Sequence, residues 1–187
     1  MEQPPELPST GNAEIRIVLR PAPVWVRLLA GAADAIVAGL FSFAVIIFIL
    51  IPNFFPDTQS TLYEYTENAT GSFANNTELA RQLLEDPSVT NMVIASQVLA
   101  YSIFFFYYLI NEWALRGSSF GKKIFGVTTV RRNPDEPLST NVMFFRAWLK
   151  TLFLLFHPIL WATFLWAAFQ KEKRTVHDLI TGTWVID

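Results

Sequence analysis

The sequence predicts an all-α integral membrane protein, built as a helical bundle with two spanning helices and a proline-broken helical hairpin near its carboxyl end. Three observations predict this class. The 187 residues are 52% hydrophobic and 16% charged, with a mean hydropathy of +0.32, which is too apolar for a soluble domain of this length. The apolar residues are gathered in runs long enough to enter or cross a bilayer. A His-Pro pair divides the last of these runs.

The amino-terminal part of the chain is expected to consist of a tail and a first spanning helix. Residues 1–23 are rich in proline and polar side chains, so they are expected to be mobile. The span is expected at about 28–51, where the chain carries a single charged residue and is long enough to cross about 30 Å of hydrocarbon. Within it, small residues recur every fourth position, a pattern that predicts close packing of another helix. These residues are Gly31, Ala35 and Gly39.

A polar loop and a second span follow. Pro52 and Pro56 are expected to end the first helix, and 52–91 is expected to be a polar outer loop with one short helix at 77–86. The loop contains two N-x-T sequons, which are most simply chance occurrences. The second span is expected at about 92–115, with tyrosines and a tryptophan near its end that suit the interface of a bilayer.

The segment 116–141 is rich in lysine and arginine, and the positive-inside rule places such a loop in the cytoplasm. The outer loop then lies on the other side, and both termini are cytoplasmic. Within the basic loop, "KIFGVTTV" and "PLST" flank the turn-rich "RRNPDE", which predicts a short β-hairpin on the membrane face.

The apolar stretch 142–169 allows two arrangements. His157-Pro158 divides it into two short arms, and the residue before a proline disfavours helix, so the stretch is expected to be a re-entrant or shallow hairpin that returns the tail 170–187 to the cytoplasm. The alternative is one kinked span, because proline is tolerated inside membrane helices. That alternative would place the basic tail outside.

Asp34 is a charged group within the first span, where burial in hydrocarbon costs about 2.5–3.5 kcal/mol on insertion scales. It therefore requires a partner, a water-filled pocket or a proton. Arg27 lies about two helical turns away on the same face. If the tail is cytoplasmic, Glu112 and Asp178 lie at the level of Arg27, and these four residues are expected to form a polar cluster.

Three ordered motifs carry a family resemblance. Arg27 and Asp34 in the first span, "NEWALRGSSFGKKIFGVTTV" from 111 to 130, and "KRTVHDLITGTWVI" from 173 to 186 together resemble the RDD family of small integral membrane proteins. The resemblance covers about 24–187, interrupted by the loop 52–91. The arginine and two aspartates that name the family fall on Arg27, Asp34 and Asp178.

The middle motif fits the family at Gly117, Gly121, Lys122 and Gly126. It departs from the family pattern immediately before Gly121, where this chain has Ser-Phe and the family commonly has Thr followed by Pro. We expect the glycines to form a tight turn at the membrane surface and the lysines to meet anionic headgroups.

The resemblance implies two kinds of role. Some members of the family have been proposed as accessory or scaffold subunits of membrane assemblies, and others as exchangers of monovalent cations for protons. The favoured expectation is an accessory or scaffold component, in which Arg27, Asp34 and Asp178 clasp the tail to the first helix. The alternative is a small cation/proton exchanger that uses Asp34 with Arg27 and Asp178. Expected partners are the lipid bilayer and either a second copy of the chain or another membrane protein.

Other classes of function are less consistent with the sequence. The net charge is −2 and there is no cysteine, which argues against nucleic-acid binding and excludes thiolate chemistry. His157 and His177 lack the spacing of a zinc helix, "GSSFGKK" is too short for a phosphate loop, and no nucleophile motif is present. An enzyme, a metal site and a cofactor are therefore not expected. The host membrane is expected to be the cell membrane in a prokaryote, or the endoplasmic reticulum in a eukaryote.

Overall fold

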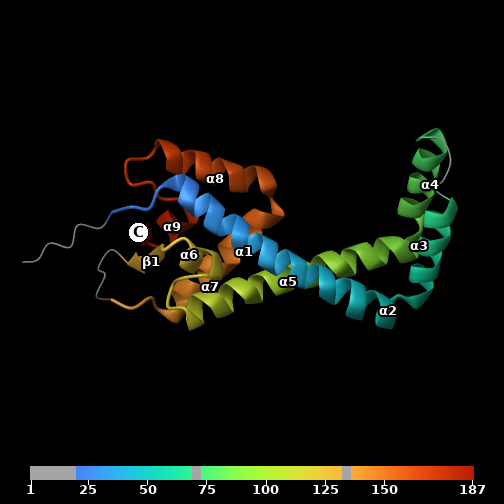
Figure 1. Cartoon of the computed structure of the whole chain (residues 1–187), viewed down its shortest axis with the longest axis horizontal. Helices are drawn as coiled ribbons and strands as arrows, with labels where there is room; N and C mark the ends of the chain where they lie inside the picture. Colours follow the sequence, from blue (N-terminus) through green and yellow to red (C-terminus); the bar gives the residue numbers. More distant parts are fainter. Residues whose placement is uncertain (1–19, 69–72, 132–135) are drawn as a thin grey trace, which may run out of the picture.

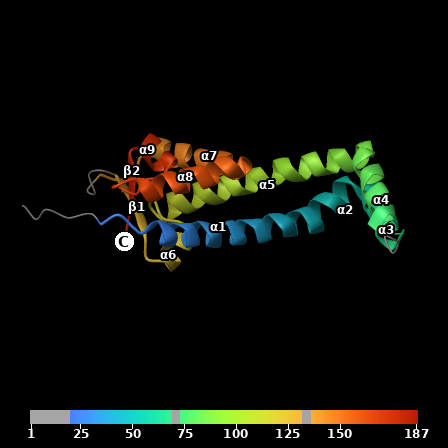
Figure 2. The same cartoon turned by 90° about the horizontal axis from the view of Figure 1, so that it is seen from above.

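The computed structural model describes residues 20–68, 73–131 and 136–187. Most of the tail expected at 1–23 and most of the "RRNPDE" turn lie outside these residues, as does part of the first sequon. The described part is predominantly helical, with a single two-stranded sheet among the described residues. Figures 1 and 2 show an elongated molecule in which two long helices run side by side and most of the short elements gather at one end.

The first long helix comprises α1 (Val24–Val45), the π-helical turn η1 (Ile46–Leu50) and α2 (Ile51–Phe54). Together they form 31 residues of high hydropathy, long and apolar enough to cross a bilayer. The π-helical turn ends at Leu50, two residues before Pro52, which has no backbone N–H to donate, so the hydrogen-bonding register changes near the missing donor. The helix extends beyond the expected 28–51 at both ends.

The second long helix is α5 (Pro87–Ala114). Its amino terminus is capped by Asp86, whose carboxylate accepts hydrogen bonds from the backbone N–H and hydroxyl of Ser88 at 2.8 and 2.6 Å. It begins five residues before the expected Met92, because the Asp-Pro cap starts the helix within the polar stretch. This helix is also long and apolar enough to cross a bilayer.

The polar segment between the long helices is more helical than expected. It forms α3 (Pro56–Asn68) and α4 (Phe73–Glu85), whereas only a short helix at 77–86 was expected. Both lie at the far end of the long pair (Figure 1). They are held there by a small apolar cluster that includes Ile51, Val89 and Met92.

The other end carries the elements formed by 116–131 and 136–187, which we call the end module. These are α6 (Phe120–Ile124), β1 (Thr128–Arg131), α7 (Thr140–Leu155), α8 (His157–Phe169), α9 (Val176–Ile180) and β2 (Thr183–Ile186). The module packs on the amino-terminal half of α1 and the carboxyl-terminal half of α5 (Figures 1 and 2).

The prediction of a β-hairpin within the basic loop is wrong. The strand at "TTVR" does form, but β1 pairs antiparallel with β2 from the carboxyl-terminal tail, with Thr129 opposite Val185. The backbone N–H of Ala22 also donates to the carbonyl of Val185, at 2.9 Å. The tail offers alternating buried and part-buried positions that complete the core around Val127 and Val185, which "PLST" does not. The tail is thus fixed both to the loop and to the start of α1.

The apolar stretch 142–169 is broken. α7 ends at Leu155, Phe156 has φ −107° and ψ 77°, and α8 begins at His157 with Pro158 in its first turn. The arms have 16 and 13 residues, so neither alone has the roughly 20 residues needed to span a bilayer. The chain doubles back here, and the tail returns to the end that carries β1 (Figure 1).

Candidate functional site

The carboxylate of Asp34 is bonded to the glycine-containing segment 117–126, which we call the loop, and to Tyr107 of α5, and not to another charged residue. Its carboxylate accepts hydrogen bonds from the hydroxyl of Ser119 at 2.5 Å, the backbone N–H of Gly121 at 2.8 Å and the phenol of Tyr107 at 2.9 Å. The side chain is 3% exposed. Three donors satisfy a buried carboxylate without a counter-ion, so Asp34 ties the start of α6 and the face of α5 to α1.

Gly121 allows this contact. A Cβ at this position would lie 2.0 Å from the carbonyl oxygen of Ala30 and 3.1 Å from Cγ of Asp34, so only glycine lets α6 lie against α1. The other motif glycines serve the turn: Gly117 and Gly126 have φ of +89° and +68°, which side chains other than hydrogen rarely permit. The close approach of the loop to α1 thus occurs at Gly121, in the first turn of α6.

A second cluster of charged groups lies beside this contact. Asp178 forms ion pairs with Arg27 and with Arg146, the latter at 2.8 Å. Glu112 pairs with Arg146 at 3.3 Å and with Lys150. Arg146, Glu112 and Asp178 are all 0% exposed. The network therefore links α1, α5, α7 and the tail through paired buried charges, each needing its partner.

The position of Asp178 is fixed by its own helix. The hydroxyl of Thr175 donates to its Oδ2 at 2.6 Å, and its carboxylate accepts the backbone N–H of Thr175 at 3.3 Å, forming a capping box. Burial by itself would raise the pKa of Asp178, but the charges of Arg146 and Arg27 and the hydrogen bond from Thr175 hold that pKa well below its ordinary range. Asp178 is therefore an ionised anchor for two arginines.

The expected cluster of four residues is thus divided into two. Arg27 and Asp178 form a pair, and Glu112 joins them through Arg146. Asp34 of α1 lies apart from them and is bonded to Ser119 and Gly121. Arg146 and Lys150 were not among the residues predicted for the cluster. A signal for them exists: two basic residues four apart in an apolar run share one helix face, and that face must turn toward acids.

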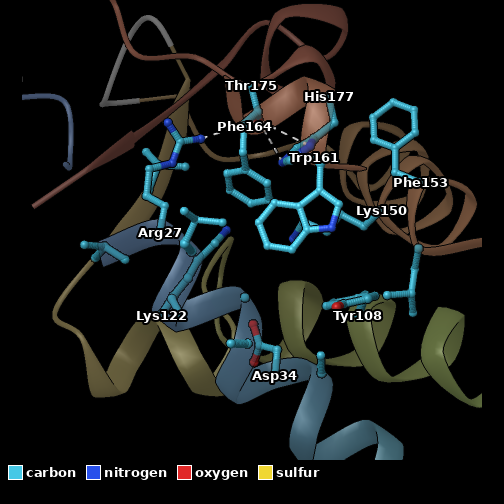
Figure 3. Close-up of a pocket in the computed structure, with 18 residues that line it drawn as sticks. Arg27, Asp34, Tyr108, Lys122, Lys150, Phe153, Trp161, Phe164, Thr175 and His177 are labelled. Atoms are coloured by element: carbon cyan, nitrogen blue, oxygen red, sulfur yellow. Dashed lines mark hydrogen bonds between the residues drawn. The ribbon is translucent and has the colours of Figure 1, made fainter. Parts of the chain in front are cut away.

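A cavity of about 240 Å³ is lined by Asp34 and by Arg27 and Lys150 of the second cluster, as Figure 3 shows. Its walls are mostly apolar and come from α1, α5, α7 and α8. Its polar lining includes Arg27, Asp34, Lys122, Lys150 and His177. Lys122 was expected at the membrane surface; it is 8% exposed instead, and its ammonium donates to the hydroxyl of Thr129 at 2.5 Å.

The small residues of the first helix do not pack closely on another helix along their whole length. Gly31 and Ala35 line the cavity, and a Cβ at Gly31 would meet nothing within 4 Å. At Gly39 the nearest atom to such a Cβ would be Cζ of Phe104 on α5, at 3.9 Å. Two of the three small residues therefore border open space.

The two long apolar helices, the loop glycines and the paired Arg27 and Asp178 reproduce one family pattern in space, and a model of the RDD family matches residues 21–182. The chain belongs to the RDD family. With two helices apolar enough to cross a bilayer, it is a membrane protein.

This RDD protein is similar to the uncharacterized protein YckC of Bacillus subtilis (strain 168), with 36% identity over 103 residues. The match covers 54% of this chain and 63% of YckC, so it spans less than two thirds of that relative. No solved structure matches the chain. Within the described residues, no three His, Cys, Asp or Glu side chains are grouped to hold a metal ion.

Proposed function

We propose that this RDD protein is a non-transporting accessory or scaffold component of a membrane assembly. The observation that carries the proposal is the closed bonding of Asp34, which accepts three hydrogen bonds from the loop and from α5. An exchange site must release and rebind its ligand, whereas a carboxylate held by three protein donors loses those bonds to bind an ion. Asp34 therefore acts as a clasp that fixes the end module.

In this proposal the end module lies on the cytoplasmic side of the membrane, with its apolar arms α7 and α8 entering the bilayer from that side, and α3 and α4 lie outside. The charge distribution supports it. Acidic residues predominate on α3 and α4, where Arg81 is paired with Glu78 and Glu85 at 2.6 Å. Exposed basic residues, among them Arg116, Lys123 and Lys171, gather at the module end, as the positive-inside rule requires. The host membrane is the cell membrane in a prokaryote or the endoplasmic reticulum in a eukaryote.

The surface of the long pair supports an assembly role. The two long helices expose large apolar side chains, such as Leu40 on α1, Phe48 on η1, and Val98 and Phe106 on α5. Such a surface suits contact with lipid, and it equally suits contact with the helices of a second copy or of another membrane protein. A module closed by buried ion pairs at one end, and two long apolar helices beyond it, suit a subunit that is held in the membrane by its helices and presents the module to partners.

Cation/proton exchange is the second candidate, favoured by one observation. Asp34 and the buried Lys122 both line the cavity, which puts two ionisable groups beside a space that an ion could enter. In this reading Asp34 releases Ser119 and Gly121 when it binds a proton or a cation.

Reconstitution distinguishes the two. The purified protein is placed in liposomes loaded with a pH-sensitive dye, and Na⁺ or K⁺ gradients are applied to wild type and to Asp34→Asn. The accessory role predicts no proton flux from either protein and a lower melting temperature for Asp34→Asn. Flux from wild type that disappears in a stably folded Asp34→Asn would establish exchange and refute the accessory role.

A further inference from the structure

The cavity between α1 and α8 is large enough to hold a ligand. At about 240 Å³ it greatly exceeds the roughly 30 Å³ that one water occupies in the liquid. Gly31 lines it and has no atom within 4 Å of where a Cβ would stand. Because Gly31 has no side chain, this part of the cavity stays open.

The mouth of the cavity lies in an apolar surface. Trp161 of α8, 61% exposed, and Ala32 of α1, also exposed, border it. Phe164 and Leu28 add to the apolar wall, and Figure 3 shows Trp161 and Phe164 lying across the space. Farther along, α8 exposes other apolar side chains, including Leu165 and Phe169. A ligand that enters between these helices meets hydrocarbon first.

The inner wall carries an excess of positive charge. Around the cavity and the adjoining network, the described residues place four cations, Arg27, Lys122, Arg146 and Lys150, against three carboxylates, Asp34, Glu112 and Asp178. Among the described residues no carboxylate forms an ion pair with Lys122. Its ammonium is bonded to the hydroxyl of Thr129 at 2.5 Å and lies 3.5 Å from the carbonyl of Gly117.

The electrostatics of Lys122 are consistent with a missing anion. Burial, together with the charges of Lys150 and Arg146, holds the pKa of Lys122 well below its ordinary range, and the more distant charges of Glu112 and Asp178 offset this only in part. An anion bound beside it would offset both effects and favour the ammonium form.

We propose that this cavity binds an anionic membrane phospholipid, with its phosphate beside Lys122 and part of an acyl chain along the apolar wall formed by α1 and α8. The apolar mouth selects a ligand that comes from the bilayer, and the unpaired cation selects one with net negative charge. This binding does not depend on whether the protein is an accessory subunit or an exchanger.

The test compares two lipids that share acyl chains and differ in net charge. The full chain, purified in a neutral detergent, is titrated with dioleoylphosphatidylglycerol or dioleoylphosphatidylcholine, and bound lipid is counted by native mass spectrometry. Wild type is expected to bind phosphatidylglycerol about fivefold more tightly, the equivalent of ~1 kcal/mol for one lysine beside an anionic headgroup. Equal affinities in wild type would overturn the proposal.

Two matched pairs of variants locate the site. Lys122→Met is expected to abolish the preference for phosphatidylglycerol, whereas Lys122→Arg and the neighbouring exposed Lys123→Met keep it. Gly31→Leu places a large side chain in the cavity and is expected to weaken the binding of both lipids by about tenfold. Gly31→Ala is expected to bind both lipids as tightly as wild type does. A loss in Lys123→Met equal to that in Lys122→Met would overturn the proposal, as would undiminished binding by Gly31→Leu.

A competition experiment distinguishes a site for phospholipid from a site for a free anion. Inorganic phosphate competes only through the headgroup contacts, so it is expected to displace phosphatidylglycerol far more weakly than unlabelled lipid does. Displacement by phosphate at the same concentration as lipid would overturn the lipid assignment. The Gly31 pair decides the matter even if Lys122→Met fails to fold, because that pair leaves every charge in place.

Discussion

Asp34 is a carboxylate whose three hydrogen-bond donors come from the loop and from α5. Asp34→Asn presents an amide N–H₂ to at least one of those donors, so the free energy of unfolding is expected to fall by about 1–3 kcal/mol. The measurement is denaturation in detergent micelles. Asp57→Asn, on an exposed position of α3, is the control and is expected to change stability by less than about 0.5 kcal/mol. Equal effects of the two would contradict the clasp.

Gly121 permits the approach of α6 to α1, because the carbonyl oxygen of Ala30 occupies the space that a Cβ would need. Gly121→Ala is therefore expected to push the loop from the helix and to cost about 1–3 kcal/mol. Gly31→Ala is the matched control on the facing helix, since its added Cβ meets nothing within 4 Å. Thermal unfolding of the two variants tests the difference, and an unchanged melting point for Gly121→Ala would exclude the close contact.

His177 is a buried imidazole whose protonation opposes folding. Burial, partly offset by Asp178 and reinforced by Arg146, Lys150 and Arg27, lowers its pKa from 6.5 to about 3. Between these two pKa values the unfolded chain binds a proton at this imidazole and the folded chain does not. The contribution of neutral His177 to the free energy of unfolding is therefore fully present above pH 6.5 and is lost as the pH falls.

The expected loss from His177 is at most about 1.4 kcal/mol per pH unit. His177→Asn is expected to flatten the decline between pH 6.5 and about 5, above the range in which Asp178 titrates. Unfolding free energies at the two pH values test this. A slope identical to that of wild type would assign the acid sensitivity to another group.

At the scale of elements, α7 connects the second long helix to the tail. Arg146 pairs with Glu112 of α5 and with Asp178 of α9, and all three are fully buried. Arg146→Met leaves two buried carboxylates short of a cation, so it is expected to cost about 3–5 kcal/mol. Arg131→Met removes the exposed pair with Glu136 and is expected to cost less than about 1 kcal/mol.

Limited proteolysis gives a second readout of this link. When Arg146 is lost, the tail is expected to be released and cleaved at Lys171 or Lys173 faster than in wild type. A tail that stays protected in Arg146→Met would show that the pairing of β1 with β2 holds it unaided.

The elements that could be predicted are those whose signal is local. Length and hydropathy predicted α1 and α5, and Pro158 predicted the break between α7 and α8. The pairing of β1 with β2 joins strands about fifty residues apart, which no short pattern encodes. α3 was missed because it is polar and mixed in composition, like a loop. Lys122 was misplaced because a lysine in a basic loop is usually exposed, and only the tertiary contact with α1 shows otherwise.

At the scale of the whole molecule, the charge asymmetry and the broken hairpin together support the proposed topology. The long helices run side by side between α3 and α4 at one end and the end module at the other (Figure 2). If the long helices cross the membrane, these two ends lie on opposite sides, and the return at Phe156 keeps the tail on the side of the module. A continuous third span would instead place the tail with α3 and α4.

Cysteine labelling tests this topology cleanly, because the chain has no cysteine of its own. Ser60→Cys on α3 and Lys171→Cys before α9 both introduce a thiol at an exposed position. In intact cells a membrane-impermeant maleimide is expected to label Ser60→Cys at once and Lys171→Cys only after permeabilisation, as the positive-inside rule and the hairpin require. Labelling of both from outside would mean that the apolar stretch spans the membrane in the cell, and Arg27 could not then pair with Asp178 across the bilayer.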